Sequence, residues 1–155
     1  MSNYPAFICE NGHVISAESR ECNKKFCRAC GKPIISTCRV CGSLIPGRPV
    51  HEYTWGAPYV APSYCEKCGK PYPWLTAAIE ATLLAIKESK DFSQAEIQQI
   101  ETILPDVVIE TPKTQLAAVR IKNAIEKGKG FAANILKQFV IDFGCDLILQ
   151  FLGIS

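Results

Sequence analysis

The sequence predicts an α+β protein, in which a small region of short β-hairpins precedes an all-α region of about four helices. Eight of the nine cysteines lie within the first 68 residues, and most of them are paired. From residue 73 onward, apolar residues recur at helical spacing and only one cysteine remains. We therefore expect two domains, residues 1–72 and residues 73–155.

The cysteine pairs of the first domain have the spacing of metal-binding knuckles. Cys27/Cys30, Cys38/Cys41 and Cys65/Cys68 each have the form C-x-x-C-G. Two intervening residues let a tight turn direct both sulfurs at one ion, and the following Gly adopts the positive φ that closes the turn. Cys9 and His13 form a looser fourth pair. These four half-sites predict two structural Zn²⁺ ions.

An internal repeat suggests how the ligands are shared. Phe26–Pro33 resembles Tyr64–Pro71, and an earlier ligand pair precedes each copy. Sequential pairing then gives a tandem zinc ribbon. Its first ion is held by Cys9, His13, Cys27 and Cys30, and its second by Cys38, Cys41, Cys65 and Cys68. A cross-braced arrangement, which joins the first pair to the third and the second to the fourth, is the alternative.

The fourth ligand of the first site is either His13 or Cys22. His13 follows Gly12, in a turn one residue wider than the other knuckles, and we favour it. Cys22 has no cysteine or histidine two or three residues away, but it would complete a four-cysteine site if His13 were only a surface residue.

The charge balance argues against a strongly basic nucleic-acid-binding domain. Residues 1–72 contain nine Lys/Arg and five Asp/Glu. Seven ligand thiolates and two Zn²⁺ ions reduce the net charge of this domain to about +1. The N-terminus shows no secretory signal and no apolar run is long enough for a membrane span, so we expect a cytoplasmic protein with reduced cysteines.

An insert between Cys41 and Cys65 is rich in proline and aromatic residues, including Tyr53, Trp55 and Tyr59. We expect these rings to cover the sparse core of the ribbon, with the binding of a partner as the alternative.

Four helices are expected after residue 72. The first begins at Pro73 and runs to about Ser89. Ser93 and Glu96 form a capping box for the second, which Pro105 should end. Thr111 should cap the third, with Leu116, Val119 and Ile125 facing inward and Gly128 closing it.

The fourth expected helix, residues 131–152, is amphipathic and is the most apolar part of the chain. Phe131, Ile135, Phe139, Phe143, Leu147 and Phe151 recur every four residues. This pattern favours the central helix of a bundle, while a seam between copies and a membrane-surface helix are alternatives. Asp142 and Asp146 on the polar side argue against membrane contact, which therefore stays a minor expectation.

The succession of C-x-N-G-H, F-C-x-x-C-G, C-x-x-C-G, Y-C-x-x-C-G and a Pro-Trp helix start resembles a family of small bacterial double-zinc-ribbon proteins, known only as a domain of unknown function. The resemblance covers Cys9 to about Trp74. It implies two zinc sites and a cytoplasmic bacterial setting, but no activity.

These observations favour a binding module over an enzyme. Both expected zinc sites have four protein ligands, so neither leaves a coordination position for substrate. We expect no catalytic residues, no small-molecule substrate, and a protein partner or self-association. Nucleic-acid binding through Arg20, Lys24, Lys25, Arg28 and Arg39 is the alternative.

Overall fold

The computed structural model describes residues 3–50 and 58–154, so Tyr53 and Trp55 of the aromatic insert lie outside the described residues. The chain divides into two compact units, residues 1–77 and residues 78–155. The expected boundary fell between residues 72 and 73. Since α1 spans Pro73–Ser89, its first turn belongs to the N-terminal unit.

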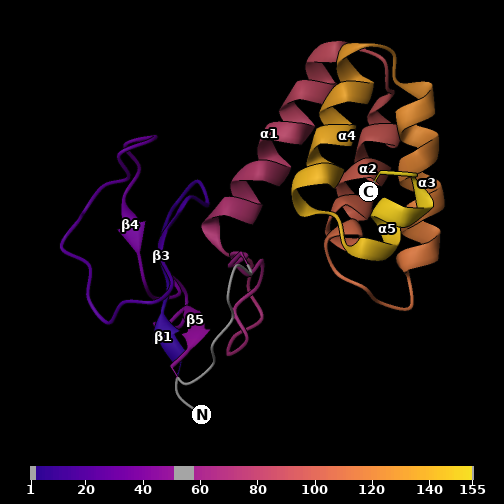
Figure 1. Ribbon diagram of the computed structural model, residues 1–155. Coiled ribbons are helices and arrows are strands. Elements are labelled where there is room, and N and C mark those ends of the chain that lie inside the picture. Colours follow the sequence, from indigo (N-terminus) through magenta and orange to yellow (C-terminus); the bar gives the residue numbers. More distant parts are fainter. Residues whose placement is uncertain (1–2, 51–57, 155) are drawn as a thin grey trace. The chain divides into compact units, whose positions relative to one another are not determined.

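The N-terminal unit contains two small antiparallel sheets (Figure 1). In one, β1 (Asn3–Pro5) pairs with β5 (Pro46–Pro49). In the other, the order is β3–β2–β4, with β2 at Phe7–Cys9, β3 at Val14–Ser16 and β4 at Ile34–Ile35. The predicted fold class, short β-hairpins followed by helices, is confirmed.

The core of this unit combines a few aliphatic side chains with two aromatic rings. Ile8, Ile45 and Leu75 are fully buried, and Tyr72 and Trp74 are almost as deeply buried. So small a core supplies little hydrophobic stabilisation, which is why domains of this size usually need a metal or a disulfide. All nine cysteines are free.

The second unit is helical. After α1 come α2 (Gln94–Val108), α3 (Thr114–Lys127), α4 (Phe131–Phe143) and α5 (Asp146–Phe151), and α3 contacts α2, α4 and α5 (Figure 1). Among the described residues, no helix is both long and apolar enough to cross a bilayer.

The predicted capping box of α2 is confirmed, but the predicted end of this helix is wrong. Ser93 Oγ accepts from the Glu96 amide, and the Glu96 carboxylate accepts from the Ser93 amide. Pro105 lies inside α2, which continues to Val108. Proline removes only one helical hydrogen bond, and burial of Val107 and Val108 holds the last turn in place.

The predicted start of α3 is also wrong, and its predicted inner face is right only at Ile125. The helix begins at Thr114, three residues after the expected cap Thr111. Leu116 and Val119 are about half exposed, whereas Ala117, Ala118, Ile121 and Ile125 are buried. Small alanines let α3 pack closely against its neighbours, and this selects a face that a search for large apolar residues overlooks.

The expected last helix is divided in two. Gly144 ends α4 with an extended backbone, and Cys145 precedes α5 while its amide donates to Val107 O at 2.9 Å. A Cβ at Gly144 would lie 2.4 Å from Val140 O, so the close approach at the break requires glycine. Phe131, Leu147 and Phe151 are exposed, while Leu136, Val140 and Ile148 are fully buried.

Candidate metal centres

Three knuckles share one hydrogen-bond pattern, which explains how the C-x-x-C-G sequence positions its sulfurs. The Gly amide donates to the carbonyl of the first cysteine at 2.8–2.9 Å in each: Gly31 to Cys27, Gly42 to Cys38, and Gly69 to Cys65. These glycines have φ between 75° and 78°, a conformation that side chains with a Cβ rarely adopt. The first cysteine of each knuckle is buried.

The Cys9–His13 turn is built differently. Gly12 has φ 93° and its amide donates to Cys9 O at 2.9 Å, while the Cys9 amide donates to His13 O at 3.0 Å. The glycine therefore precedes the second candidate ligand here, whereas it follows that ligand in the other knuckles. The turn lies between β2 and β3, and this hairpin carries both side chains.

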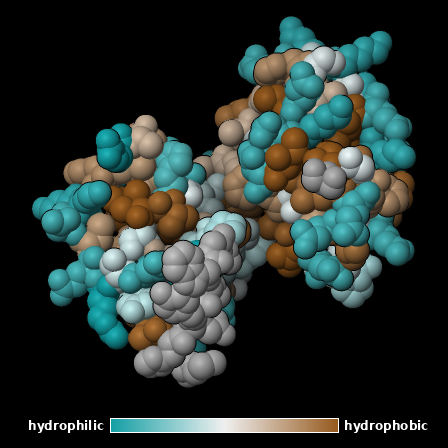
Figure 2. Space-filling model, viewed as in Figure 1, coloured by the Kyte–Doolittle hydropathy of each residue, from teal (hydrophilic) through white to brown (hydrophobic). Residues whose placement is uncertain are grey.

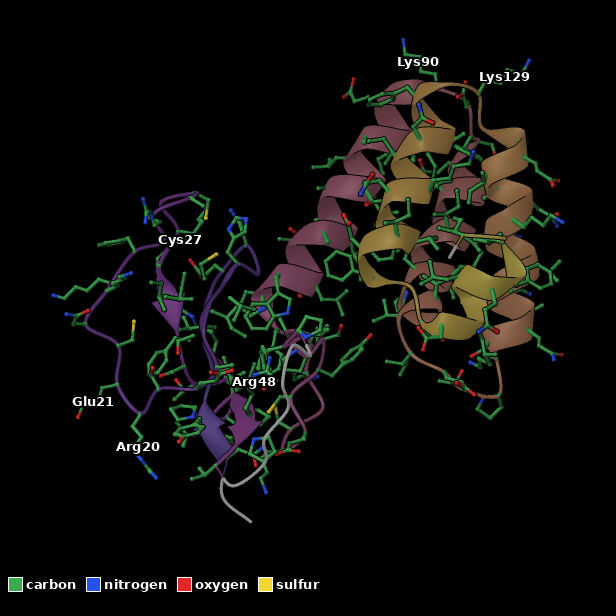
Figure 3. All side chains as sticks on the ribbon, in the orientation of Figure 1. Arg20, Glu21, Cys27, Arg48, Lys90 and Lys129 are labelled. Carbon is green, nitrogen blue, oxygen red and sulfur yellow. The ribbon has the colours of Figure 1, made fainter. Side chains whose placement is uncertain are left out.

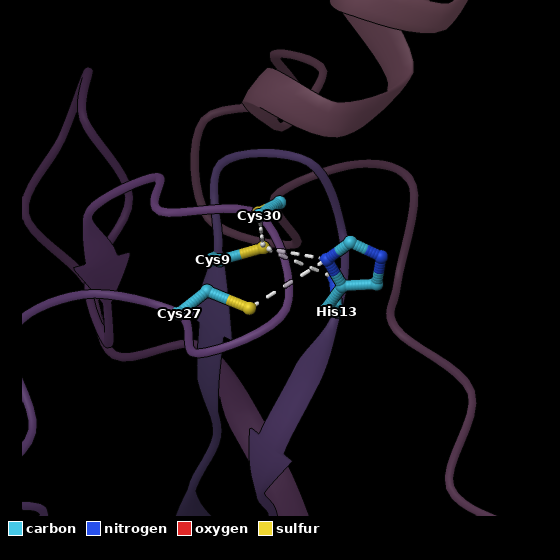
Figure 4. Close-up of side chains that lie close together, drawn as sticks. All are labelled: Cys9, His13, Cys27 and Cys30. Carbon is cyan, nitrogen blue, oxygen red and sulfur yellow. Dashed lines mark hydrogen bonds between the residues drawn. The ribbon is translucent and has the colours of Figure 1, made fainter.

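The first candidate metal centre brings together Cys9, His13, Cys27 and Cys30 (Figure 4). Their candidate ligand atoms all lie within 4.8 Å of one another. His13 Nδ1 is 3.4 Å from Cys9 Sγ and 3.7 Å from Cys27 Sγ, and the sulfurs of Cys9 and Cys30 are 3.6 Å apart. The Nδ1 atom faces the sulfurs, so it is the nitrogen that would bind a metal.

The second candidate metal centre consists of Cys38, Cys41, Cys65 and Cys68. The Cys38 and Cys68 sulfurs are 3.7 Å apart, and those of Cys41 and Cys65 are 3.6 Å apart. The two groups are the ones that sequential pairing requires, and they differ from the cross-braced alternative.

The spacing of both groups fits a tetrahedral metal ion. With Zn–S bonds of about 2.3 Å and a Zn–N bond of about 2.0 Å, a tetrahedron separates two sulfurs by about 3.8 Å and a sulfur from a nitrogen by about 3.5 Å. The measured separations agree with these values. They are far longer than the disulfide bond length of about 2.05 Å. Thiolate and imidazole ligands in this geometry are typical of structural zinc sites.

Cys22 lies outside both groups. Its sulfur is 3.8 Å from the Lys24 carbonyl oxygen, and no metal group among the described residues includes it. Cys145 lies beside the α4–α5 break, in the other unit.

The electrostatics of the second site show why it needs a cation. Amide hydrogens of Cys68 and Lys67 lower the pKa of Cys65 to about 6. At Cys68, the Lys70 amide lowers the pKa, but burial and the sulfurs of Cys38, Cys65 and Cys41 raise it to about 11. The neighbouring sulfurs thus oppose ionisation of Cys68, and a bound cation removes that opposition.

The same opposition operates at Cys9 of the first site. Burial raises the pKa of Cys9, and the neighbouring sulfurs of Cys30 and Cys27 raise it further, although the amides of His13 and Asn11 lower it. The Lys32 amide lowers the pKa of Cys30. The Cys9 sulfur also accepts from the His13 amide at 3.3 Å, a contact that orients the thiolate.

Sequence reasoning missed two residues next to these centres, Tyr72 and Trp74. Their rings are almost fully buried and stack with centroids 4.9 Å apart. The sequence Tyr-Pro-Trp directly after the last knuckle is the signal that could have revealed them.

Small antiparallel sheets that carry two four-ligand groups on knuckles place the chain among small metal proteins of the zinc-ribbon type. The chain belongs to the family described as "Uncharacterized protein conserved in bacteria (DUF2321)", which matches residues 2–150. This match confirms the resemblance seen in the sequence. No curated protein and no solved structure matches the chain significantly.

Proposed function

We propose that the protein is a zinc-stabilised adaptor, in which two structural Zn²⁺ ions hold the N-terminal unit rigid so that it binds a protein partner. The observation that carries the zinc assignment is the closed set of four protein ligands at each centre. A catalytic zinc keeps a position for water or substrate, so four protein ligands favour a structural role without enzymatic activity.

Exposed apolar side chains at the knuckles support a protein partner. Phe26, Val40 and Leu44 are 61%, 65% and 61% exposed. Phe26 directly precedes Cys27, Val40 lies between Cys38 and Cys41, and Leu44 pairs with Thr37 across the second knuckle. Rigid apolar groups of this kind bind other proteins with little loss of conformational entropy.

Nucleic-acid binding is the second candidate, and one segment favours it. Arg20, Lys24, Lys25 and Arg28 are all exposed. The Arg20 guanidinium lies over the Tyr4 ring, 5.6 Å from its centroid, and Figure 3 shows Arg20 next to Glu21 on the loop after β3. Two other arginines form ion pairs within the unit, Arg39 with Glu10 at 3.2 Å and Arg48 with Glu18 at 2.6 Å. These pairs reduce the positive charge that the surface offers to phosphates.

Metal analysis tests the zinc assignment. We expect two Zn²⁺ per chain in protein purified with a reducing agent, and fewer than two would contradict it.

The partner class is tested by capture on the immobilised full-length chain. The wild type should retain partner proteins, and Val40→Glu/Leu44→Glu should lose them. Leu84→Glu is the control and should retain them, because Leu84 is an exposed site in the other unit. Equal retention by all three would contradict the adaptor surface, and salt-sensitive binding of single-stranded DNA or RNA would favour the second candidate.

A further inference from the structure

Tyr72 and Trp74, here called the aromatic pair, contact the turns of both candidate metal centres. The two residues flank Pro73, the first residue of α1, and lie shortly after the Cys65/Cys68 knuckle. Tyr72 is 1% exposed and Trp74 is 4% exposed, although neither residue is a metal ligand. All the contacts described below lie within the N-terminal unit.

Trp74 packs against the Cys9–His13 turn of the first centre. A Cβ placed on Gly12 would lie 3.0 Å from Trp74 Cβ and 3.4 Å from Trp74 Cγ. The side chain therefore lies directly on the backbone that precedes His13. Trp74 Nε1 also donates to Pro62 O at 2.9 Å, which fixes the plane of the ring.

Tyr72 contacts the second centre. Its amide donates to Ser63 O at 3.0 Å, and Tyr64 pairs with Pro71, so the Cys65/Cys68 knuckle is closed by the segment that carries Tyr72. Burial raises the pKa of the Tyr72 hydroxyl, and the nearby Cys65 thiol raises it further. The stacked rings thus connect the segment that closes the Cys65/Cys68 knuckle to the Cys9–His13 turn of the other centre.

We propose that the aromatic pair couples the two metal centres, so that zinc bound at either centre raises the affinity of the other for zinc. A metal at the first centre fixes the Cys9–His13 turn, and this turn supports Trp74. Through the stack, Trp74 holds Tyr72 and the Cys65/Cys68 knuckle in the geometry that binds metal. The converse holds because coupling between two sites is reciprocal. This proposal rests on the zinc assignment made above.

The test compares zinc affinities of the full-length chain with and without a functional first centre. Cys30→Ser disables the first centre, and chelator competition then gives the Zn²⁺ affinity of the second. Amide signals of Gly31 and Gly69 report each centre separately, because each glycine closes one knuckle. We expect Cys30→Ser to weaken zinc binding at the second centre by a factor of roughly 5–150, the usual range for coupled sites. Cys41→Ser should weaken the first centre by the same factor.

Substitutions in the aromatic pair then test whether it provides the coupling. In a Trp74→Leu background, we expect Cys30→Ser to leave the affinity of the second centre almost unchanged. Trp74→Phe retains a ring that can stack on Tyr72, so it should restore most of the coupling. Leu75→Ala is the matched control and should leave the coupling intact, because Leu75 is also buried in this turn but is not part of the stack.

The outcomes separate this proposal from the one on which it rests. Two zinc ions whose affinities do not depend on each other would overturn the coupling alone. Coupling that persists undiminished in Trp74→Leu would overturn the role of the pair, and fewer than two ions in the wild type would overturn both proposals. The comparison of Cys30→Ser with the wild type leaves the pair intact, so it decides whether the centres are coupled even if Trp74→Leu does not fold.

Discussion

The position of one glycine distinguishes the two metal centres at the residue scale. Gly12 precedes His13, whereas Gly31, Gly42 and Gly69 follow the second cysteine of their knuckles. The longer His13 side chain reaches the sulfurs from one residue further along, through its Nδ1 atom. The structure brings His13, and not Cys22, together with Cys9, Cys27 and Cys30, and the sequence favoured this grouping because the turn spacing follows from local chemistry.

Substitution of His13 should remove one metal and leave the other. We expect His13→Ala to lower the zinc content from two ions per chain toward one, because the first centre then retains three protein ligands. Cys22→Ser is the matched control and should retain both ions, since Cys22 lies outside the groups. Elemental analysis of both variants checks this, and loss of an ion with Cys22→Ser would contradict the ligand assignment.

Glu96 is the titratable residue of the helical unit with the clearest structural role. Its hydrogen bond with Lys127, followed by those with the Ser93 amide and side chain, lowers its pKa from 4.5 to about 2. A carboxylate with a lowered pKa stabilises the fold above its ordinary pKa. That contribution is lost as the pH falls through the folded pKa.

The pKa of Glu96 can be measured directly by carbon-detected NMR of its carboxyl group. We expect a midpoint near pH 2 in the wild type, and a higher midpoint in Lys127→Ala because the largest cause of the shift is removed. Stability attributable to Glu96 should decline between about pH 4.5 and pH 2. An ordinary midpoint in the wild type would show that the ion pair does not form in solution.

At the scale of the element, local signals predicted the knuckles and the cap of α2 better than they predicted helix faces. A knuckle depends on residues within one turn, so its sequence determines its geometry. The buried face of α3 depends on which neighbours it packs against: among α2, α4 and α5, Ala117 and Ala118 are buried while Leu116 and Val119 are about half exposed. Such a choice between two apolar stripes is made by tertiary packing, which no local pattern contains.

Two substitutions on α3 test this corrected face. Ile121 is fully buried and Val119 is 46% exposed. We expect Ile121→Ala to lower the free energy of unfolding by roughly 2–5 kcal/mol, because it leaves a cavity. Val119→Ala should change it by about 0.5 kcal/mol or less. Urea unfolding followed by circular dichroism measures both, and similar losses would mean that α3 presents a different face to its neighbours.

The continuation of α2 past Pro105 and the break at Gly144 were also hard to predict from the sequence. Pro105 is tolerated inside α2 because the last turn is anchored by burial and by the Cys145 amide on Val107 O. Gly144 separates α4 from α5 because the chain there approaches Val140 O closely. The end of α2 thus depends on a contact with the α4–α5 junction that is distant in sequence, whereas the approach at Gly144 is to a residue four positions earlier in α4.

Apolar side chains reach the surface of both units in Figure 2, but the units depend on different sources of stability at the scale of the whole molecule. The helical unit has a large aliphatic core that includes Ile86, Leu104, Ile121, Leu136 and Ile148. The N-terminal unit has few buried aliphatics and both candidate metal centres. Structural zinc contributes about 10–16 kcal/mol to the folding of small domains at neutral pH.

Metal removal should therefore unfold one unit and spare the other. After chelation under reducing conditions, we expect amide signals of residues 3–50 to lose their dispersion, because the knuckles need a cation. Signals of residues 94–150 should stay dispersed and most of the helical circular dichroism should persist, with recovery on addition of Zn²⁺. Unfolding of both units together, or of neither, would contradict this division.

Sequential pairing has a consequence for the order in which the chain acquires its metals. Every ligand of the first centre lies before residue 31, and every ligand of the second lies after residue 37. Metal binding therefore closes two consecutive loops, each shorter than the overlapping loops of a cross-braced fold, and short loops cost less entropy to close. During synthesis from the N-terminus, the first ion can be captured before Cys65 has been made. The first centre reaches its full affinity for this ion only after Trp74 has been synthesised.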